Sequence, residues 1–158
     1  MSHIALQEAD SVDQQIANLS ALEAAVHRVG LSIREGHKFR GYATDRAEQS
    51  ALPSGFKSFA ELEAACKRVI SLPGNNECEI GVVASKKFPG TYSLAFDFYR
   101  HGHAIAKKAG LSCDNLLMHY HMEASRELAH SQGYSYSEVA VGDGQYDVEI
   151  DATAVVGY

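Results

Sequence analysis

The fold is decided by two apolar segments, Cys78-Glu79-Ile80-Gly81-Val82-Val83-Ala84 and Tyr92-Ser93-Leu94-Ala95-Phe96-Asp97-Phe98. In each segment apolar side chains recur at every second position, which is the period of a strand that buries one face. Residues 86–90 connect the two segments as a turn. We therefore predict an antiparallel hairpin with one strongly apolar face.

A long helix and a second hairpin follow this pair. Residues 112–131 have helical periodicity that buries Leu116, Leu117, Tyr120, Ala124 and Leu128, and Gly133 stands where a left-handed residue ends a helix. Residues 134–141 and 145–152 then alternate around Gly142-Asp143-Gly144. In the last strand one face carries Tyr146, Val148 and Ile150, and the other carries Asp147, Glu149 and Asp151. We expect the acidic face to be solvated.

The sequence before Cys78 begins with a short, mildly apolar segment, residues 2–8, and a helical pattern follows it. Apolar residues at helical spacing over residues 12–29 predict a helix that Asp10 or Ser11 caps and Gly30 ends. Residues 31–42 mix large apolar side chains with two glycines, which indicates strand, turn and strand.

The apolar periodicity is lost over residues 43–57 and resumes after Ser58. Residues 43–57 lose apolar periodicity and gather proline, serine and glycine, so we expect a mobile surface excursion. Ser58 and Glu61 have the spacing of a capping box. The apolar stripe after them, Phe59, Leu62, Cys66, Val69 and Ile70, predicts a helix that Pro73-Gly74 ends.

Composition limits the class of protein. A chain of 158 residues with 46% hydrophobic content forms one domain, 1–158, with a single core. A formal net charge of −6 and a pI near 5.7 argue against nucleic acid as the partner. The three cysteines lie far apart, as buried thiols of a reducing compartment do. No secretory leader or membrane-length apolar run is present, so we expect a cytoplasmic protein without a membrane partner.

A family resemblance rests on motifs in a fixed order. They are an opening Met-Ser-His, a helix carrying Leu22 to Gly30, Val69-Ile70-Ser71-Leu72-Pro73-Gly74, Gly90-Thr91-Tyr92-Ser93-Leu94, Phe96-Asp97-Phe98-Tyr99, a Leu116-Leu117 helix and Gly133-Tyr134-Ser135. In these the chain resembles the family called domain of unknown function 1257. That family includes the hypothetical chloroplast reading frame thirty-five proteins of algal plastids, with relatives in cyanobacteria, other bacteria and phages.

The resemblance implies little chemistry. It brings no agreed enzymatic activity and no catalytic residues, and it implies an association with an ATPase of the AAA type. It also implies the stroma as the compartment of a plastid-encoded member and the host cytoplasm for a phage-encoded one. The chain departs from the family pattern by extra residues between Tyr42 and Ser58 and by His101-Gly102-His103.

Taken together, the elements predict an α+β domain. Strand, helix, strands, helix and strands follow one another along the chain, which predicts an antiparallel-rich sheet of five to seven strands with two or three helices on one face. We interpret this as an elaboration of the ferredoxin-like sandwich.

Histidines form the first candidate site. Five of the eight fall between His101 and His130, and neutral imidazole is a common metal ligand. A zinc site would combine His101 and His103 with His119 or His121, and Glu123 would serve as ligand or base. The alternative is a solvated helix face of mixed charge, and no His-Glu-x-x-His run is present.

Basic residues form the second candidate site. Arg34, Lys38 and Arg40 alternate with aromatic residues and could hold an anion, a nucleotide or a single strand by charge and stacking. The alternative is a solvated pair of strands. No phosphate-binding loop and no nucleophile elbow appear in the sequence.

Three functions follow from these observations. The first is a non-catalytic binding or adaptor protein whose partner is another protein, with the AAA-type ATPase that the resemblance implies as the candidate partner and recognition expected on residues 42–57. The second is a histidine-based metal-binding or ligand-binding protein or enzyme, with zinc as its one candidate cofactor. The third is the anion binder. The sequence leaves the oligomeric state open, a homo-oligomer included.

Overall fold

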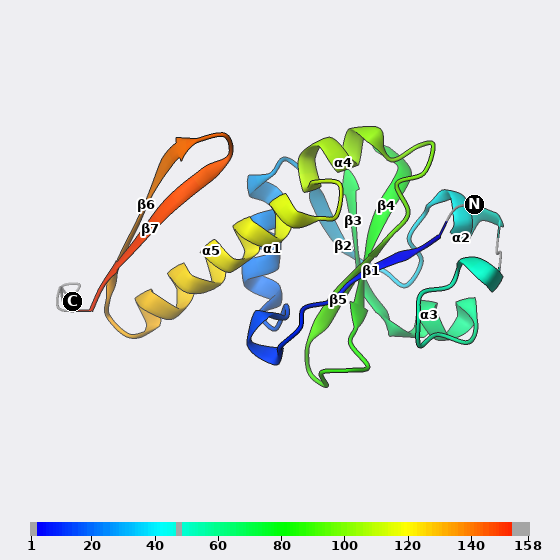
Figure 1. Cartoon of the computed structure of the whole chain (residues 1–158), viewed down its shortest axis with the longest axis horizontal. Helices are drawn as coiled ribbons and strands as arrows, with labels where there is room; N and C mark the ends of the chain where they lie inside the picture. The colour runs from blue at the N-terminus through cyan, green and yellow to red at the C-terminus, as the bar shows by residue number, and fades with distance from the viewer. Residues whose placement is uncertain (1–2, 47–48, 153–158) are drawn as a thin grey trace.

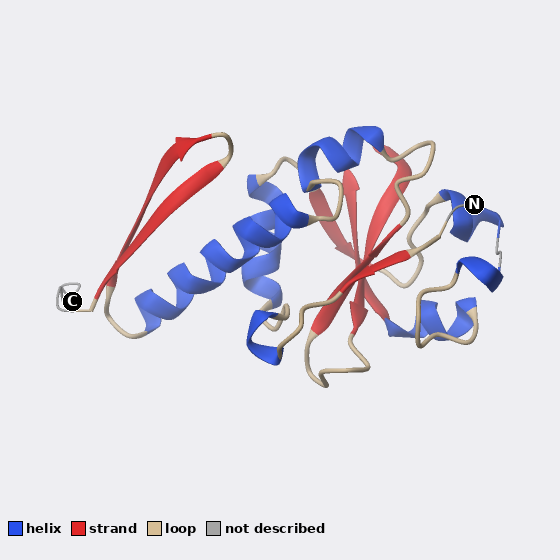
Figure 2. Cartoon of the chain, viewed as in Figure 1, coloured by secondary structure: helices blue, strands red, loops and turns tan. Residues whose placement is uncertain are grey.

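The computed structural model describes residues 3–46 and 49–152 of the chain (Figure 1). Its strands are β1 (Ala5–Gln7), β2 (Ser32–Glu35), β3 (Cys66–Leu72), β4 (Asn75–Ala84), β5 (Tyr92–Phe96), β6 (Ser135–Gly142) and β7 (Gln145–Asp151). Its α-helices are α1 (Leu19–Arg28), α2 (Tyr42–Arg46), α3 (Phe59–Ala65), α4 (His103–Ala109) and α5 (Asp114–Ser131), and η1 (Val12–Gln14) and η2 (Gln49–Ala51) are single 3-10 turns (Figure 2).

The main sheet has five strands in the order β1-β5-β4-β3-β2, and every neighbouring pair is antiparallel. The predicted hairpin is its centre, where Ile80 lies opposite Phe96 and Val82 opposite Leu94. The predicted α+β class and antiparallel sheet are therefore confirmed. The strand order is not ferredoxin-like, because three strands, rather than one, separate the parallel strands β1 and β2 that α1 connects.

One face of the sheet is covered by α1, α4 and α5 (Figure 1). The side chains that meet there come from all three helices and from β3, β4 and β5, and the largest include Leu22, Ile70, Ile80, Leu94, Ile105 and Leu116. Phe96 is 7% exposed, as its predicted face requires, and Leu117 is partly buried against the same cluster.

A second core lies on the opposite face of the sheet. Val69, Val83 and Ala95 point to this side because side chains alternate along a strand. They are covered by side chains of the β2–α2 loop, α2, η2, the η2–α3 connection and α3, which are Phe39, Ala43, Ala51, Phe56 and Leu62. The predicted single helical layer is thus accompanied by a second one.

The prediction of a surface excursion at residues 43–57 is wrong for the described part of that segment. Ala43 is 0% exposed, Ala51 is 1% exposed and Phe56 is 9% exposed. The backbone also pairs with the sheet region, since the Ile4 N–H donates to the Ala51 carbonyl over 2.9 Å. Small and isolated apolar residues escape a periodicity search, although they fill the space above a sheet equally well.

The close approach of Phe39 explains the glycine at the centre of β4. A Cβ at Gly81 would lie 2.5 Å from the nearest carbon of the Phe39 ring. Only glycine leaves room for an aromatic ring to lie against the strand backbone. Gly81 therefore fixes where the loop between β2 and α2 crosses the sheet.

The single helix predicted between residues 58 and 72 is a short helix followed by a strand. The helix begins where the capping box predicted, because the Glu61 N–H donates to Ser58 Oγ over 3.1 Å. It ends at Ala65, and residues 66–72 form β3 instead of continuing the helix. Val69 and Ile70 are β-branched, and pairing with β4 outweighs the helical spacing.

Three further boundaries differ from the predictions. Asn18 caps α1 by accepting from the Ala21 N–H, so α1 starts at Leu19. Of residues 12–18, which were predicted to be part of this helix, only the 3-10 turn η1 is helical. Residues 31–42 contain one strand, β2, rather than two. α4 is a helix that the sequence patterns did not predict, and α5 agrees with its predicted range and is followed by Gly133 at φ 74°.

All three cysteines are free and buried, as expected. Burial raises the pKa of the Cys66 thiol to about 11 and that of the Cys78 thiol to about 12, and it raises the pKa of Cys113 as well. Their thiolate forms are disfavoured, which makes them packing groups rather than nucleophiles.

None of the helices in the ranges 3–46 and 49–152 is long and apolar enough to cross a membrane.

Candidate functional site

The predicted second hairpin forms, but it stands apart from the main sheet at the end of α5 (Figure 1). We call residues 135–151, which comprise β6, β7 and their turn, the hairpin arm. Asp143 and Gly144 both have positive φ, at 51° and 72°, as the two central residues of a type I′ turn require. The arm is therefore specified locally, by its turn and its alternating strands.

The register of the arm defines two faces. The inner face consists of opposed pairs that include side chains contacting α1 and α5, and its members are Tyr136, Glu138, Ala140, Tyr146, Val148 and Ile150. The outer face places the acidic residues of β7 beside small or aliphatic residues of β6, with Ser137 opposite Glu149 and Val139 opposite Asp147.

The arm is far more exposed than its apolar content predicts. None of residues 135–151 is buried. Val139 is 62% exposed, Val141 53%, Val148 42% and Ile150 45%, which makes four of the eight large hydrophobic residues that are exposed in the described part of the chain. Leu128, expected in the core, is also 60% exposed near the end of α5. Exposed apolar residues gathered on one element mark an interaction surface.

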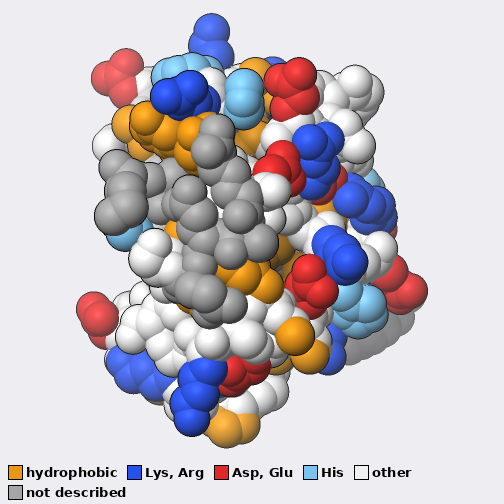
Figure 3. All heavy atoms as spheres, turned by 90° about the vertical axis from the view of Figure 1, so that its right-hand side faces the viewer, with side chains coloured by type: hydrophobic (Ala, Val, Ile, Leu, Met, Phe, Trp, Pro, Cys, Tyr) orange, Lys and Arg blue, Asp and Glu red, His pale blue; other side chains and the backbone are white. Residues whose placement is uncertain are grey.

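The arm also carries most of the net charge of the protein. It has no lysine or arginine and five acidic residues, which are Glu138, Asp143, Asp147, Glu149 and Asp151. The rest of the chain has 15 acidic and 14 basic residues, so five of the six net negative charges lie on the arm. At the opposite end of the molecule, acidic and basic side chains are interspersed (Figure 3).

A single arginine at the end of α1 attaches the arm to the helices. Arg28 Nη2 forms an ion pair with Glu138 of β6, and Arg28 Nη1 lies 3.3 Å from Glu123 Oε1 of α5. The guanidinium carbon lies 5.2 Å from the centre of the Tyr146 ring. The hydrogen bond from Arg28 lowers the pKa of Glu138, so this carboxylate stays ionised.

His119 and Tyr136 complete what we call the Arg28 cluster. The His119 ring meets the edge of Tyr146 at a centroid distance of 5.5 Å, and its Nδ1 is buried without a hydrogen-bond partner among the described residues. Burial, followed by the nearby Arg28, lowers the pKa of His119. The Tyr136 hydroxyl donates to Glu138 over 2.7 Å, and burial together with that carboxylate raises the pKa of Tyr136 to about 12.

The four histidines predicted to bind zinc occupy different surroundings. His101 lies in the turn before α4 and His103 is the first residue of α4, both exposed, while His119 faces the arm. His121 lines a separate cavity, and Glu123 pairs with Arg28. Within residues 3–46 and 49–152 no group of three or more His, Cys, Asp or Glu side chains is arranged to hold a metal. The structure gives the zinc prediction no support.

The predicted basic set converges on a carboxylate that the sequence patterns passed over. Glu79 is 1% exposed and lies between two of the arginines. Arg34 Nη2 is 2.8 Å from Glu79 Oε2, and the Arg40 backbone N–H donates to Glu79 Oε1 over 3.0 Å. Arg40 also pairs with Asp45, and Lys38 lines a neighbouring cavity of about 400 Å³. Both arginine charges are balanced, which weakens the case for an anion site. The sequence feature that could have pointed to Glu79 is its position as a lone charged residue in an otherwise apolar strand.

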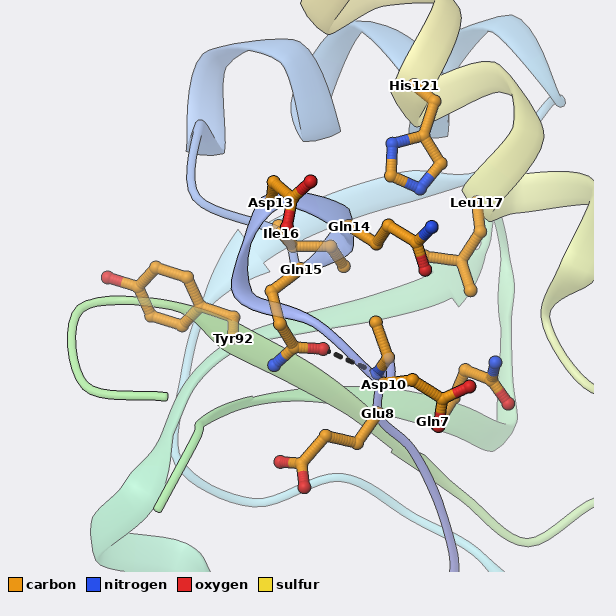
Figure 4. A pocket seen from close by; sticks show the side chains of 11 residues that line it. Gln7, Glu8, Asp10, Asp13, Gln14, Gln15, Ile16, Tyr92, Leu117 and His121 are labelled. Carbon is orange, nitrogen blue, oxygen red and sulfur yellow. Dashed lines mark hydrogen bonds between the residues drawn. The ribbon is translucent and has the colours of Figure 1, made fainter. Parts of the chain in front are cut away.

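A cavity of about 510 Å³ lies between residues 7–16, Tyr92 and α5 (Figure 4). Gln15 closes one side, since its Oε1 accepts from the Ala9 N–H over 2.7 Å. The imidazole of His121, an exposed residue, points toward the cavity. Three acidic residues and no basic ones line it, so it disfavours anions.

Comparison of the chain with models of known protein families, with curated proteins and with solved structures finds no match. The resemblance to domain of unknown function 1257 therefore stays a prediction.

Proposed function

We propose that this protein is a non-catalytic binding module whose hairpin arm engages a partner protein with a basic surface. The observation that carries the proposal is the coincidence, on one projecting element, of exposed aliphatic residues and five of the six net negative charges. A protein that only needs to remain in solution gains nothing from placing Val139 and Val141 at 62% and 53% exposure.

The two properties of the arm serve different steps of binding. Its concentrated negative charge attracts a basic partner over several ångströms and orients the encounter, an effect that salt weakens. The aliphatic residues then contribute stability on contact, at about 25 cal/mol for each Å² of apolar surface removed from water. The Arg28 cluster limits the motion of the arm and so reduces the entropy lost on binding.

The partner class follows from the charge, and the family resemblance supplies one candidate. An AAA-type ATPase, or a substrate of such a motor, is the first protein to test. The proposal places the recognition surface on the hairpin arm instead of on residues 42–57. Those residues contribute buried side chains to the second core.

The proposal is tested by affinity capture from the native cell with matched variants of the full chain. Val139→Ser with Val141→Ser removes exposed apolar groups from the arm, and Val12→Ser with Leu111→Ser removes groups elsewhere that are 55% and 84% exposed. We expect at least one protein to be captured by the wild type and the control but lost from the arm variant, and to bind the purified wild type directly in low salt. Equal capture by both variants would contradict the proposal.

A further inference from the structure

We infer that the outer edge of β7 accepts a third strand, an extended segment of the partner in which basic and aliphatic residues alternate. This inference rests on the proposed function and deepens it by specifying how the partner is recognised. Three features of the arm support it: an open edge, an alternating surface, and two carboxylates, Asp147 and Glu149, that form no ion pair with the described residues.

The edge of β7 is open in the described part of the chain. β6 and β7 form a sheet of two strands, so one edge of β7 has no neighbouring strand. In an antiparallel ladder alternate residues direct their N–H and C=O groups away from the existing neighbour, and these groups can pair with an added strand. A two-stranded hairpin is only marginally stable alone, and a third strand stabilises it.

The side chains of β7 specify the chemistry of that added strand. Val148 and Ile150 lie on the inner face, and Asp147 and Glu149 lie on the outer face. A paired strand places its own side chains beside these on the same two faces, alternating with a period of two. Lysine or arginine therefore fits beside Asp147 and Glu149, and an aliphatic residue fits beside Val148 and Ile150.

The charges also decide against a second copy of the chain as the occupant. Asp147 and Glu149 make no ion pair within the described residues. If two β7 edges paired, the acidic residues of one copy would lie beside those of the other, and like charges in that arrangement destabilise a sheet. The same acidic edge that blocks self-association attracts a basic strand.

The probe is a short labelled peptide of alternating lysine and valine, titrated onto the full chain by fluorescence anisotropy. A peptide of the same composition with its lysines and valines in separate blocks controls for charge alone. We expect the alternating peptide to bind more tightly and to slow hydrogen exchange at backbone amides of β7. Equal binding of the two peptides, or unchanged exchange in β7, would overturn the inference.

Charge variants locate the binding. Asp147→Asn with Glu149→Gln should weaken peptide binding by about fivefold, the effect of two opposed charge pairs in a sheet. Asp10→Asn with Asp13→Asn removes two exposed charges elsewhere and should leave binding unchanged. Failure of the inference is separable from failure of the proposed function. If the partner protein still requires Val139 and Val141 while the alternating peptide does not bind, the arm binds its partner by another geometry.

Discussion

At the scale of single residues, the attachment of the hairpin arm depends on Arg28. Its guanidinium contacts three elements at once, through Glu123 of α5, Glu138 of β6 and Tyr146 of β7. The Glu123 side chain is only 8% exposed, so its charge depends on nearby arginines for compensation. The cluster was not visible in the sequence, because its members lie up to 118 positions apart and follow no pattern.

Arg28→Ala should lower the free energy of unfolding by about 1–3 kcal/mol, because it leaves a buried carboxylate poorly paired. Arg126 is the matched control, since it lies 3.8 Å from the same Glu123 but is half exposed. Arg126→Ala should cost about 0.5 kcal/mol or less. Urea unfolding of both variants measures the difference, and equal losses would show that Arg28 has no special role.

His119 makes stability depend on pH. Its pKa is lowered in the folded protein, chiefly by burial and then by Arg28, although Glu123 and Glu138 act in the opposite direction. As the pH falls through about 6.5, the ordinary pKa of histidine, His119 becomes protonated in the unfolded chain but stays neutral in the folded protein. Stability therefore falls with pH in this range, and the loss ends below the folded pKa.

His119→Gln should reduce the fall in unfolding free energy between about pH 7.5 and pH 5.5 relative to the wild type. The informative quantity is the change with pH rather than the absolute stability, which the substitution itself alters. A His119→Gln protein with the wild-type slope would contradict the assignment.

At the scale of elements, the sequence predicted what regular periodicity encodes. Alternation located β4, β5 and the arm, and helical spacing located α5. It failed for residues 66–72, which have helical spacing and whose burial as a strand does not alternate, and where cover comes from scattered residues such as Ala51 and Phe56. Periodicity also predicted which residues share each face of the arm. It could not predict that the arm is separate from the five-stranded sheet, because which strands pair depends on tertiary packing.

Phe56 tests the corrected role of residues 43–57. Phe56→Ala should cost about 3 kcal/mol, because a mostly buried ring leaves a cavity over the sheet. Phe88→Ala, in the half-exposed turn before β5, should cost about 1 kcal/mol or less. Thermal or urea unfolding compares the two. A loss of unfolding free energy as small for Phe56→Ala as for Phe88→Ala would support the surface excursion that the sequence predicted.

At the scale of the whole molecule, a two-core body carries an arm with no buried residue. Regions with few buried contacts open locally at lower free energy than the core. Backbone amides of β6 and β7 should therefore exchange hydrogen much faster than those of β4 in the native protein. Arg28→Ala should accelerate exchange in the arm more than in β4, and uniform protection throughout would show that the arm and body unfold together.

The position of β1 in the sheet has a consequence for biosynthesis. Within residues 3–46 and 49–152 its one strand partner is β5, with Ala5 opposite Phe96. A ribosome makes some ninety residues between the two, so Ala5–Gln7 remains an unpaired edge while β2, β3 and β4 are synthesised. The meander of β2 to β5 can assemble through shorter loops, and closure by β1 then completes the sheet. Until that moment the nascent chain presents an open β5 edge, which is where a chaperone would bind to protect it.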